Sequence, residues 1–221
     1  MNIIMTGSTS FVGAATVREL LRRGHTVTAI VRPKSSKLDT ILEGNEEALL
    51  SGRLLVTEND LSEPEKLLEK VTKPQDVFCH FGWGGSGSAS RTDKALQEKN
   101  MEISLETIRT AKALGCKKFL FSGSQAEYGM HQDLITENTV CEPKSLYGEA
   151  KLAMREKGEK LCDELGLRYI HARIFSAYGP GDHPWTLVES CLDIFLSNKE
   201  MSLGACTQKW NFLYIDDLAR G

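Results

Sequence analysis

The chain has 221 residues, of which 41% are hydrophobic and 26% charged, a composition that is ordinary for a folded domain with a substantial core. Its 27 basic and 30 acidic side chains give a net charge of -3, which excludes the basic field of proteins that bind nucleic acid or an anionic membrane. Six scattered cysteines without a Cys-x-x-Cys pair predict neither a zinc site nor a disulfide framework, so we expect no metal and a reducing, cytoplasmic setting.

The first residues, Met1 to Met5, lack the charged and apolar regions of a signal peptide, and no apolar run approaches the roughly 20 residues of a membrane span. Instead, short apolar runs alternate with amphipathic stretches. The predicted strands are 2–6, 26–31, 54–58, 77–81, 118–123 and 168–174. The predicted helices are 11–23, 64–70, 95–114, 146–165 and 187–197, and three of them are followed by a glycine that ends the pattern, at Gly24, Gly115 and Gly166.

This β-α-β-α order with short links predicts an α/β protein whose parallel sheet has helices on both faces, the doubly wound Rossmann arrangement. We expect residues 1–172 to form a dinucleotide-binding domain and residues 173–221 to begin a second lobe. Residues 82–88 consist mainly of Gly and Ser and follow the strand 77–81. They predict a mobile loop at the carboxyl edge of the sheet, where open parallel sheets bind ligands.

Residues 6–13 join the first strand to the first helix, where dinucleotide-binding folds place a glycine turn. Gly7 suits the tight turn and Gly13 suits close packing of the helix, whereas Ser10 occupies the middle position, where a third glycine is common. The N–H groups at the helix start, near Phe11 and Val12, would face the pyrophosphate. We therefore predict a bound dinucleotide, with a plain strand–helix turn as the alternative.

The residues after the second strand indicate which dinucleotide is bound. Arg32 and Lys34 come first, and no acid follows before Asp39. An arginine here accommodates the 2′-phosphate of NADP, whereas an acid would bind the ribose hydroxyl of NAD, so NADP is predicted first and NAD second. Asp60, after the third strand, suits both a hydrogen bond to the adenine amino group and a helix cap, and both alternatives stay open.

Tyr147 and Lys151 are four residues apart in the predicted helix 146–165, which puts a phenol and an ammonium on one face, one turn apart. A free tyrosine ionises near pH 10, and a fixed cation beside it lowers its pKa toward the neutral range. The pair therefore predicts a proton-transfer device. A solvated lysine beside a half-buried tyrosine has the same spacing and is the alternative.

With these features in place, the chain resembles the extended short-chain dehydrogenase/reductase family, which comprises NAD(P)-dependent nucleotide-sugar epimerases, dehydratases and reductases. The resemblance runs through nearly the whole chain, with the motifs in family order. They are TGSTSFVG at 6–13, Asp60-Leu61, HFGW at 80–83, residues 100–107, FSGSQAEYG at 121–129, Tyr147-x-x-x-Lys151, RIFSAYGPGD at 173–182 and FLYIDD at 212–217.

The resemblance implies roles for individual residues. Ser124 matches the catalytic Ser or Thr, Tyr147 the proton donor or acceptor, and Lys151 the residue that binds the nicotinamide ribose and lowers the tyrosine pKa. Asn100 matches an asparagine that bonds the main chain and supports the site, with an ordinary helical polar residue as an equal alternative. The implied cofactor-binding residues are Gly7, Ser10, Phe11, Val12, Gly13, Arg32, Lys34, Asp60, Leu61, Phe81, Gly82, Trp83, Asn100, Ser122, Tyr147, Lys151 and Phe175.

The residues beside Ser124 bear on the reaction. The family's sugar dehydratases carry Thr-Asp-Glu there, whereas this chain has Ser124-Gln125-Ala126, which disfavours water elimination. Two reactions remain: a 4-ketoreductase that uses hydride once, and a 4-epimerase that returns the same hydride to the other face. Arg32 and the similarity of residues 123–129 and 208–214 to 4-keto-6-deoxysugar reductases place the reductase first. A cofactor-binding fragment or regulatory protein without turnover is the third alternative.

The resemblance also concerns the end of the chain and its partners. Ser176 stands where many members have an Asn that contacts the sugar diphosphate. Members usually continue for several tens of residues beyond Asp217, so residues 173–221 are expected to be a partial substrate lobe, with apolar surface exposed around 187–203. A nucleotide-sugar substrate is implied, as is a homodimer formed through the helices that contain Asn100 and Tyr147.

Overall fold

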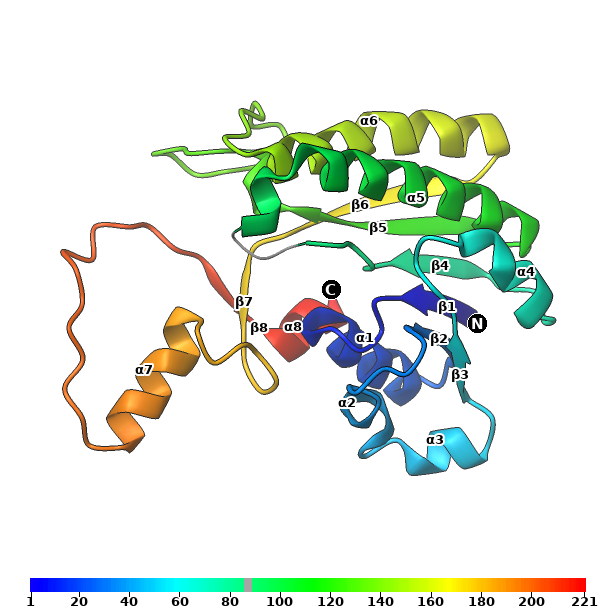
Figure 1. Ribbon diagram of the computed structural model, residues 1–221, viewed down its shortest axis with the longest axis horizontal. Helices are drawn as coiled ribbons and strands as arrows, with labels where there is room; N and C mark the ends of the chain where they lie inside the picture. The colour runs from blue at the N-terminus through cyan, green and yellow to red at the C-terminus, as the bar shows by residue number, and fades with distance from the viewer. Residues whose placement is uncertain (86–88) are drawn as a thin grey trace.

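The computed structural model describes residues 1–85 and 89–221. Six parallel strands form one sheet in the order β3-β2-β1-β4-β5-β6, which confirms the predicted doubly wound arrangement (Figure 1). They are β1 (Asn2–Thr6), β2 (Thr26–Val31), β3 (Leu54–Glu58), β4 (Val77–His80), β5 (Lys118–Ser124) and β6 (Arg168–Ile174). Residues 86–88 of the predicted mobile loop lie outside the described residues.

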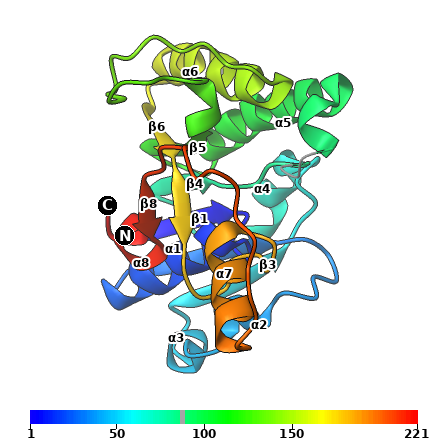
Figure 2. The ribbon, with the colours of Figure 1, turned by 90° about the vertical axis from the view of Figure 1, so that its left-hand side faces the viewer.

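One face of the sheet is covered by α5 (Lys94–Ala113) and α6 (Leu146–Leu165), which lie side by side (Figures 1 and 2). Because side chains alternate along a strand, Ile4 of β1 points to this face, where Ile108 of α5 and Met154 of α6 complete an apolar core. All three side chains are fully buried. Burying each stabilises the fold by about 1.5–3 kcal/mol relative to exposing it.

The opposite face is covered by α1 (Phe11–Arg22), with α2 (Asp39–Leu42) and α3 (Glu46–Leu50) beside it. Ile3 and Met5, the neighbours of Ile4 in β1, pack here against Val17 of α1. The last helix, α8 (Ile215–Arg220), lies against α1. Arg23 donates a hydrogen bond of 2.6 Å to the carbonyl of Arg220, which fixes α8 beside the end of α1.

The segment after β6 extends away from the sheet (Figure 1). It contains β7 (Ser176–Tyr178), α7 (Leu187–Leu196) and β8 (Phe212–Tyr214), and β7 pairs with β8 in parallel. The apolar exposure predicted around 187–203 is confirmed, because five large side chains there are between 47% and 82% exposed: Leu187, Leu192, Phe195, Leu196 and Leu203.

Sequence periodicity locates the long elements to within one or two residues. Gly24, Gly115 and Gly166 have positive φ directly after their helices, as predicted for helix ends. The elements without a prediction are short, because a few residues show no helical or strand period. They are α2, α3, α8, β7, β8 and the single-turn segments η2 (Ala89–Thr92) and η3 (Gln125–Glu127); the predicted helix 64–70 is split into η1 (Pro64–Lys66) and α4 (Leu67–Lys70).

The strand order reverses between β1 and β4, since β2 continues the sheet on one side and β5 on the other. Loops that follow two such strands run in opposite directions and leave a crevice at the carboxyl edge of the sheet. The predicted site residues of both loops, Gly7 and Gly82, lie at this crevice.

Within residues 1–85 and 89–221, none of the helices combines the length and apolar content needed to cross a bilayer. Among the same residues, no group of three or more His, Cys, Asp or Glu side chains is arranged to hold a metal ion.

Candidate active site

The loop after β1 passes so close to the end of β4 that only glycine fits at residue 7. Gly7 has a φ of +68°, and a Cβ there would lie 2.7 Å from the carbonyl carbon of Phe81 and 2.8 Å from the nitrogen of Gly82. A Cβ on Gly13 would collide with the carbonyl oxygen of Gly7, so α1 packs directly on this turn. The predicted reasons for both glycines are confirmed.

Ser10, in the middle of the glycine turn, caps α1. Its side chain accepts a hydrogen bond of 3.1 Å from the N–H of Gly13. The N–H groups of Phe11 and Val12 belong to the first helical turn, which has no intrahelical acceptors for them, and the helix dipole favours an anion there. This helix start therefore fits a pyrophosphate group.

A chain of buried hydrogen bonds fixes the two sides of the crevice. Thr6 Oγ1, at the end of β1, lies 2.8 Å from His80 Nδ1, at the end of β4. His80 Nε2 lies 3.1 Å from Ser104 Oγ, whose hydroxyl donates to the carbonyl of Asn100 in α5 at 2.8 Å. Because Ser104 donates to that carbonyl, it accepts from His80, which assigns the Nε2–H tautomer and makes Nδ1 an acceptor for Thr6.

The imidazole of His80 is neutral near pH 7. Burial lowers its pKa to about 3, and the charge of Lys151 adds to that effect. Thr6, which donates to His80, accepts in turn from the N–H of Gly82 at 3.3 Å. The hydrogen bonds therefore run in one direction, from the loop after β4 through β1 and β4 to α5.

Asn100 closes this chain on the same loop. Its amide donates to the carbonyl of Gly84 at 2.7 Å and accepts from the N–H of Gly84 at 3.0 Å. The expectation that Asn100 bonds the main chain is confirmed. Gly82 and Gly84 are thus both held, and Trp83 between them donates from its indole nitrogen to Gln97 at 2.9 Å.

The held indole of Trp83 forms part of an aromatic enclosure around Lys151. The Lys151 ammonium nitrogen lies 3.9 Å from the ring centroid of Trp83, 4.6 Å from that of Phe121 and 5.7 Å from that of Tyr147. It also donates a hydrogen bond of 2.7 Å to the carbonyl of Ser122. Burial lowers the pKa of Lys151 to about 7.

The pKa of Tyr147 moves in the direction opposite to the sequence-based expectation. The phenol is 9% exposed, and burial raises its pKa, although Ser124 as hydrogen-bonding partner and the positive charge of Arg91 counteract the rise. The four-residue spacing of Tyr147 and Lys151 could not show that the Lys151 ammonium donates a hydrogen bond to the Ser122 carbonyl. Tyr147 is therefore a neutral phenol with a proton to donate, next to Ser124.

Ser124 ends β5 and begins a tight turn that sequence reasoning did not resolve. Its Oγ accepts from the N–H of Ala126 at 3.2 Å, and its own N–H donates to Oε1 of Glu127 at 2.7 Å. This reciprocal pattern is a capping box. The serine three residues before a glutamate was the signal that could have predicted it.

Glu127 is fully buried and lies against two basic side chains of β6. Its carboxylate is 2.9 Å and 3.0 Å from His171 Nε2 and accepts from Arg173 Nε at 2.7 Å. Burial alone would raise the pKa of Glu127, but hydrogen bonds from His171, Arg173 and the Ser124 N–H outweigh burial and lower it. None of His171, Arg173 and Glu127 was predicted as a site residue.

The basic turn after β2 has acidic neighbours. The strand register pairs Val31 of β2 with Glu58 of β3, and Oε1 of Glu58 accepts from the N–H of Lys34 at 3.3 Å. Arg32 and Lys34 are both exposed. A carboxylate thus reaches the end of β2 from the next strand, where the sequence of β2 itself offers none.

Asp60 closes a short turn with Ser62 and does not cap the following helix, because the N-cap position of η1 is Glu63. Its Oδ1 accepts from the N–H of Ser62 at 2.8 Å and from the hydroxyl of Ser62 at 2.6 Å. These bonds lower the pKa of Asp60, and the charges of Lys99 and Arg32 contribute. The adjacent Leu61 lines the crevice, since a Cβ on Gly82 would lie 2.7 Å from Leu61 Cδ1.

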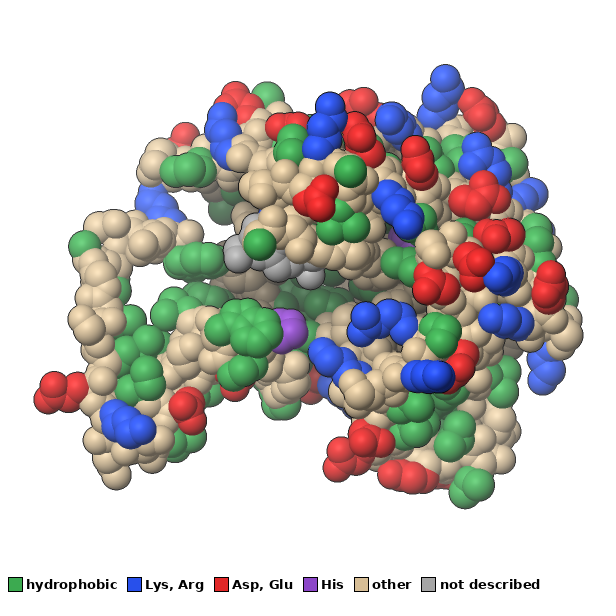
Figure 3. Space-filling view, in the orientation of Figure 1, with side chains coloured by type: hydrophobic (Ala, Val, Ile, Leu, Met, Phe, Trp, Pro, Cys, Tyr) green, Lys and Arg blue, Asp and Glu red, His purple; other side chains and the backbone are tan. Residues whose placement is uncertain are grey.

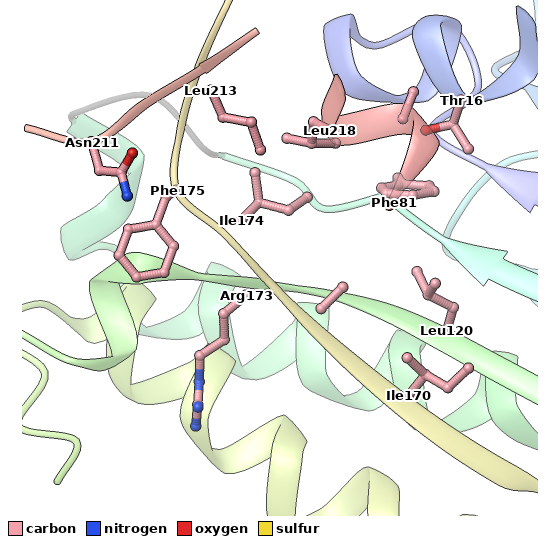
Figure 4. A pocket seen from close by; sticks show the side chains of 13 residues that line it. Thr16, Phe81, Leu120, Ile170, Arg173, Ile174, Phe175, Asn211, Leu213 and Leu218 are labelled. Carbon is pink, nitrogen blue, oxygen red and sulfur yellow. The ribbon is translucent and has the colours of Figure 1, made fainter. Parts of the chain in front are cut away.

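Phe81 and Phe175 lie apart from Tyr147. Both line a cavity of about 440 Å³ on the face of the sheet that carries α1 and α8, together with Thr16, Ile174 and Leu218 (Figure 4). The Phe81 backbone, rather than its ring, lies against Gly7. The predicted role of Phe175 in cofactor binding stays a prediction.

The carboxyl edge of the sheet is open to solvent. Figure 3 shows this face hollowed between the layer of α5 and α6 and the layer of α1 and α2, with Lys and Arg side chains along part of the lower edge. A cavity of about 760 Å³ at the start of α1 is lined by Ser10 and Phe11, by Lys37, and by His183 from the segment after β7. The edge thus has room for a large polar ligand.

The geometry suits proton exchange with an oxygen atom. The Ser124 hydroxyl, which already accepts from Ala126, keeps its own proton for an acceptor, and Tyr147 carries a second proton beside it. An alkoxide that develops between them would be stabilised by both donors. The crevice beside them fits a dinucleotide through the glycine turn and the start of α1.

A protein-family model, described as the NAD dependent epimerase/dehydratase family, matches residues 3–221. The chain is 27% identical to a Bacillus subtilis (strain 168) protein called an uncharacterized UDP-glucose epimerase, over 100% of this chain and 71% of that protein. It is 30% identical to dTDP-6-deoxy-L-talose 4-dehydrogenase (NAD(+)) of Aggregatibacter actinomycetemcomitans, over 77% of this chain and 60% of that enzyme. The chain thus spans less than two thirds of the dehydrogenase.

Solved structures agree on the fold. UDP-N-acetylglucosamine 4-epimerase of Methanobrevibacter ruminantium has a TM-score of 0.84 at 24% identity, with 99% of this chain and 70% of that chain covered. UDP-glucose 4-epimerase of Thermotoga maritima has a TM-score of 0.83 at 25% identity, with 100% and 71% covered. UDP-glucuronic acid 4-epimerase of Bacillus cereus, solved with NAD, has a TM-score of 0.81 at 24% identity, with 100% and 71% covered.

The chain of hydrogen bonds through His80 predicts the effect of Thr6→Val. This substitution keeps the shape of the side chain but leaves His80 Nδ1 and the Gly82 N–H without their partner. We expect the free energy of unfolding to fall by about 1–3 kcal/mol, the usual cost of buried polar groups left unpaired. Denaturant titration measures this loss.

Thr110→Val is the matched control. The Thr110 hydroxyl is also buried in α5, but it has no hydrogen-bond partner within the part of the chain that the structure describes. Its removal is expected to leave stability unchanged or to raise it. Equal losses in the two variants would contradict the role of Thr6.

Proposed function

The chain belongs to the NAD dependent epimerase/dehydratase family, and on that premise we propose that it is an enzyme that transfers hydride at an oxygen-bearing carbon of a nucleotide sugar. The observation that carries the proposal is the arrangement of Ser124, Tyr147 and Lys151 at the edge of the crevice between β1 and β4. Binding of a dinucleotide alone would not require a phenol, a hydroxyl and a buried ammonium at one place.

The crevice residues have separate roles in this proposal. The Gly7–Gly13 turn and the start of α1 bind the pyrophosphate, and Lys151 and the Trp83 segment lie along the nicotinamide half. Nicotinamide, when bound, supplies or accepts the hydride. Ser124 donates a hydrogen bond to the reacting oxygen, and Tyr147 gives that oxygen its proton during reduction or removes it during oxidation.

The fit of a dinucleotide rests on the observed crevice. Side chains at Gly7 and Gly82 would fill it, because the first would meet the Phe81 backbone and the second would meet Leu61. Ser10 takes the Gly13 N–H, which leaves the start of α1 at Phe11 and Val12 for an anion. A diphosphate is an anion of that kind.

For the reaction, we propose reduction of a 4-keto group of a nucleoside-diphosphate deoxysugar as the first candidate. The name of the relative from Aggregatibacter describes redox chemistry at C4 of such a sugar. The turn at Gln125 and Ala126 lacks the acid pair of dehydratases, and the carboxylate of Glu127 is occupied by His171 and Arg173. Because the Glu127 carboxylate is buried, it does not reach substrate as a separate acid or base.

A 4-epimerase is the second candidate. The solved structures similar in fold include several proteins named as 4-epimerases of UDP-sugars. The same three residues serve both reactions, since epimerisation consists of oxidation and reduction at one carbon. The two candidates differ in whether the cofactor leaves in its oxidised form after each turnover.

For the cofactor, we propose NAD, which revises the preference for NADP drawn from Arg32. The Aggregatibacter relative is named for NAD(+), and the Bacillus cereus structure contains NAD. Glu58 reaches the end of β2 and is suited to accept from a ribose hydroxyl, and its negative charge would oppose a 2′-phosphate. NADP, bound through Arg32, is the alternative.

The homodimer implied by the family resemblance is also a proposal. Helices α5 and α6 form one outer layer, and Ile103 and Leu152 on them are partly exposed. The mass of the particle in solution, measured by light scattering, tests it, and a monomer at all concentrations would contradict it.

Tyr147→Phe tests the catalytic proposal. The substitution removes the proton donor but keeps the buried ring, so we expect turnover to fall by about 10²–10⁴-fold while affinity for NADH changes little. The measurements are cofactor oxidation with a panel of nucleoside-diphosphate 4-keto-sugars and NADH titration by fluorescence. Intact turnover in this variant would refute the mechanism.

The choice of cofactor is tested by thermal shift. NADH is expected to raise the melting temperature more than NADPH at equal concentration, because the ligand that binds the folded state more tightly stabilises it more. Glu58→Gln is expected to reduce the difference between the melting-temperature shifts that NADH and NADPH produce. Glu63→Gln, which removes an exposed carboxylate paired with Lys66, is expected to leave that difference unchanged. A clear preference for NADPH would restore the interpretation based on Arg32.

A further inference from the structure

We infer that Glu127 is a positioning residue of the site, whose buried carboxylate fixes Ser124 for the reacting oxygen and provides the negative charge that balances Lys151. This inference rests on the proposed function, because it assigns Glu127 a part in the work of Ser124, Tyr147 and Lys151. Neither the composition of β5 nor the spacing of Tyr147 and Lys151 predicts it.

The contacts of Glu127 are complete and specific. One oxygen accepts from the Ser124 N–H at 2.7 Å, and the other accepts from Arg173 Nε at 2.7 Å. His171 Nε2 lies 2.9 Å and 3.0 Å from the two oxygens. The side chain of Glu127 is 0% exposed, and those of His171 and Arg173 are 8% and 10% exposed. Such a carboxylate is rigid and has one orientation.

That orientation determines where Ser124 lies. Ser124 is the last residue of β5, and its backbone is extended, with φ of -145° and ψ of 147°. The bond from its N–H to Glu127 and the bond from Ala126 to its hydroxyl hold it in the capping box. Loss of the carboxylate would free the Ser124 backbone to rotate, and the hydroxyl would move with it.

The electrostatic part concerns Lys151. Lys151 is 2% exposed, and the contacts of its ammonium within residues 1–85 and 89–221 are with a neutral carbonyl and with aromatic rings. Glu127 is the carboxylate that acts on it, and it favours the charged form against the effect of burial. Buried charges require such compensation.

The titratable and charged groups near Glu127 are His171, Arg173 and Tyr169 from β6 and Tyr147 and Lys151 from α6. Arg91 of η2 lies over the Tyr147 ring, with its guanidinium carbon 4.8 Å from the ring centroid. The charge of Glu127 raises the pKa of both Lys151 and Tyr147. Removal of that charge would therefore lower both pKa values. A protonated Tyr147 and a cationic Lys151 would both be lost at a lower pH than in the unaltered protein.

A purely structural role would also explain a buried ion pair between the turn after β5 and β6. The two roles differ in their effect on pH dependence. If Glu127 only joins the turn after β5 to β6, its substitution changes the stability of the fold alone. If it positions Ser124 and balances the charge of Lys151, its substitution also changes kcat and the alkaline limb of the pH profile of kcat.

The test is Glu127→Gln. We expect kcat to fall by about 10- to 100-fold, the range found when an outer partner that orients a reactive group is removed. KM for NADH is expected to stay within about threefold, because the fully buried Glu127 carboxylate is not among the residues proposed to bind the cofactor. The alkaline limb of the pH profile is expected to move to lower pH. Glu149→Gln, which removes an exposed carboxylate two residues from Tyr147, is the control and is expected to change neither quantity.

A second variant shows whether a loss of activity comes from unfolding of the protein. Glu127→Gln leaves Arg173 buried without its anion, whereas Glu127→Gln combined with Arg173→Met removes both charges. The double variant is expected to fold and to keep the loss in kcat, because Ser124 still lacks a charged acceptor. Activity equal to that of the unaltered protein in the double variant would overturn the inference.

Ionisation of Tyr147 provides a readout that requires no substrate. An ultraviolet titration of the phenol, with the Tyr147→Phe signal subtracted, is expected to give a lower pKa in Glu127→Gln than in the unaltered protein. An unchanged titration would overturn the inference. If no nucleotide sugar is turned over by the unaltered protein, the proposed function fails, and the titration still decides the electrostatic role of Glu127.

Discussion

The hydrogen-bond chain that runs from Gly82 through Thr6, His80 and Ser104 to Asn100 is the constraint on which the site depends. The reversal of strand order between β1 and β4 opens a crevice, and a crevice by itself has flexible walls. The chain joins the ends of both strands to α5 and returns to the loop at Gly84. Because each hydroxyl donates to one neighbour and accepts from another, the direction of every bond is determined by the next.

The same chain connects the cofactor side of the crevice to the catalytic side. Because Gly82 and Gly84 are fixed by hydrogen bonds, the indole of Trp83 stays over Lys151. The ring centroids of Trp83 and Tyr147 are 6.3 Å apart in an edge-on arrangement. The ammonium is thereby kept out of water and directed at the Ser122 carbonyl, one residue from the Gly123–Ser124 end of β5. The polar chain that ends on α5 and the aromatic enclosure beside α6 lie on the same face of the sheet, and together they define one position for Lys151.

Much of the fold could be predicted because its long elements repeat a simple pattern. The strands alternate or are wholly apolar, the helices end in glycine, and the turn at Gly7 follows from a backbone conformation that only glycine adopts readily. The bond of Asn100 to the main chain followed from the family resemblance. Elements shorter than two turns, such as α2 and α3, have no period to read.

What sequence could not supply were relations between distant strands. Glu58 reaches the end of β2 only through the β2–β3 register, so a search for an acid within β2 itself pointed to NADP. The pKa of Tyr147 depends on burial by elements that its own helix does not contain. Glu127 meets His171 and Arg173 across a strand pairing separated by more than forty residues of chain, a separation at which local patterns carry no information.

The contact of one carboxylate with two basic side chains and a main-chain N–H has a consequence for how this family branch can change over time. Loss of any one of Glu127, His171 and Arg173 leaves a buried charge or a buried donor without its partner, and each single replacement is therefore costly. Lineages would then pass between this trio and an apolar alternative only through paired or compensated substitutions. The residues at these three positions should therefore covary among related sequences and should rarely be replaced one at a time.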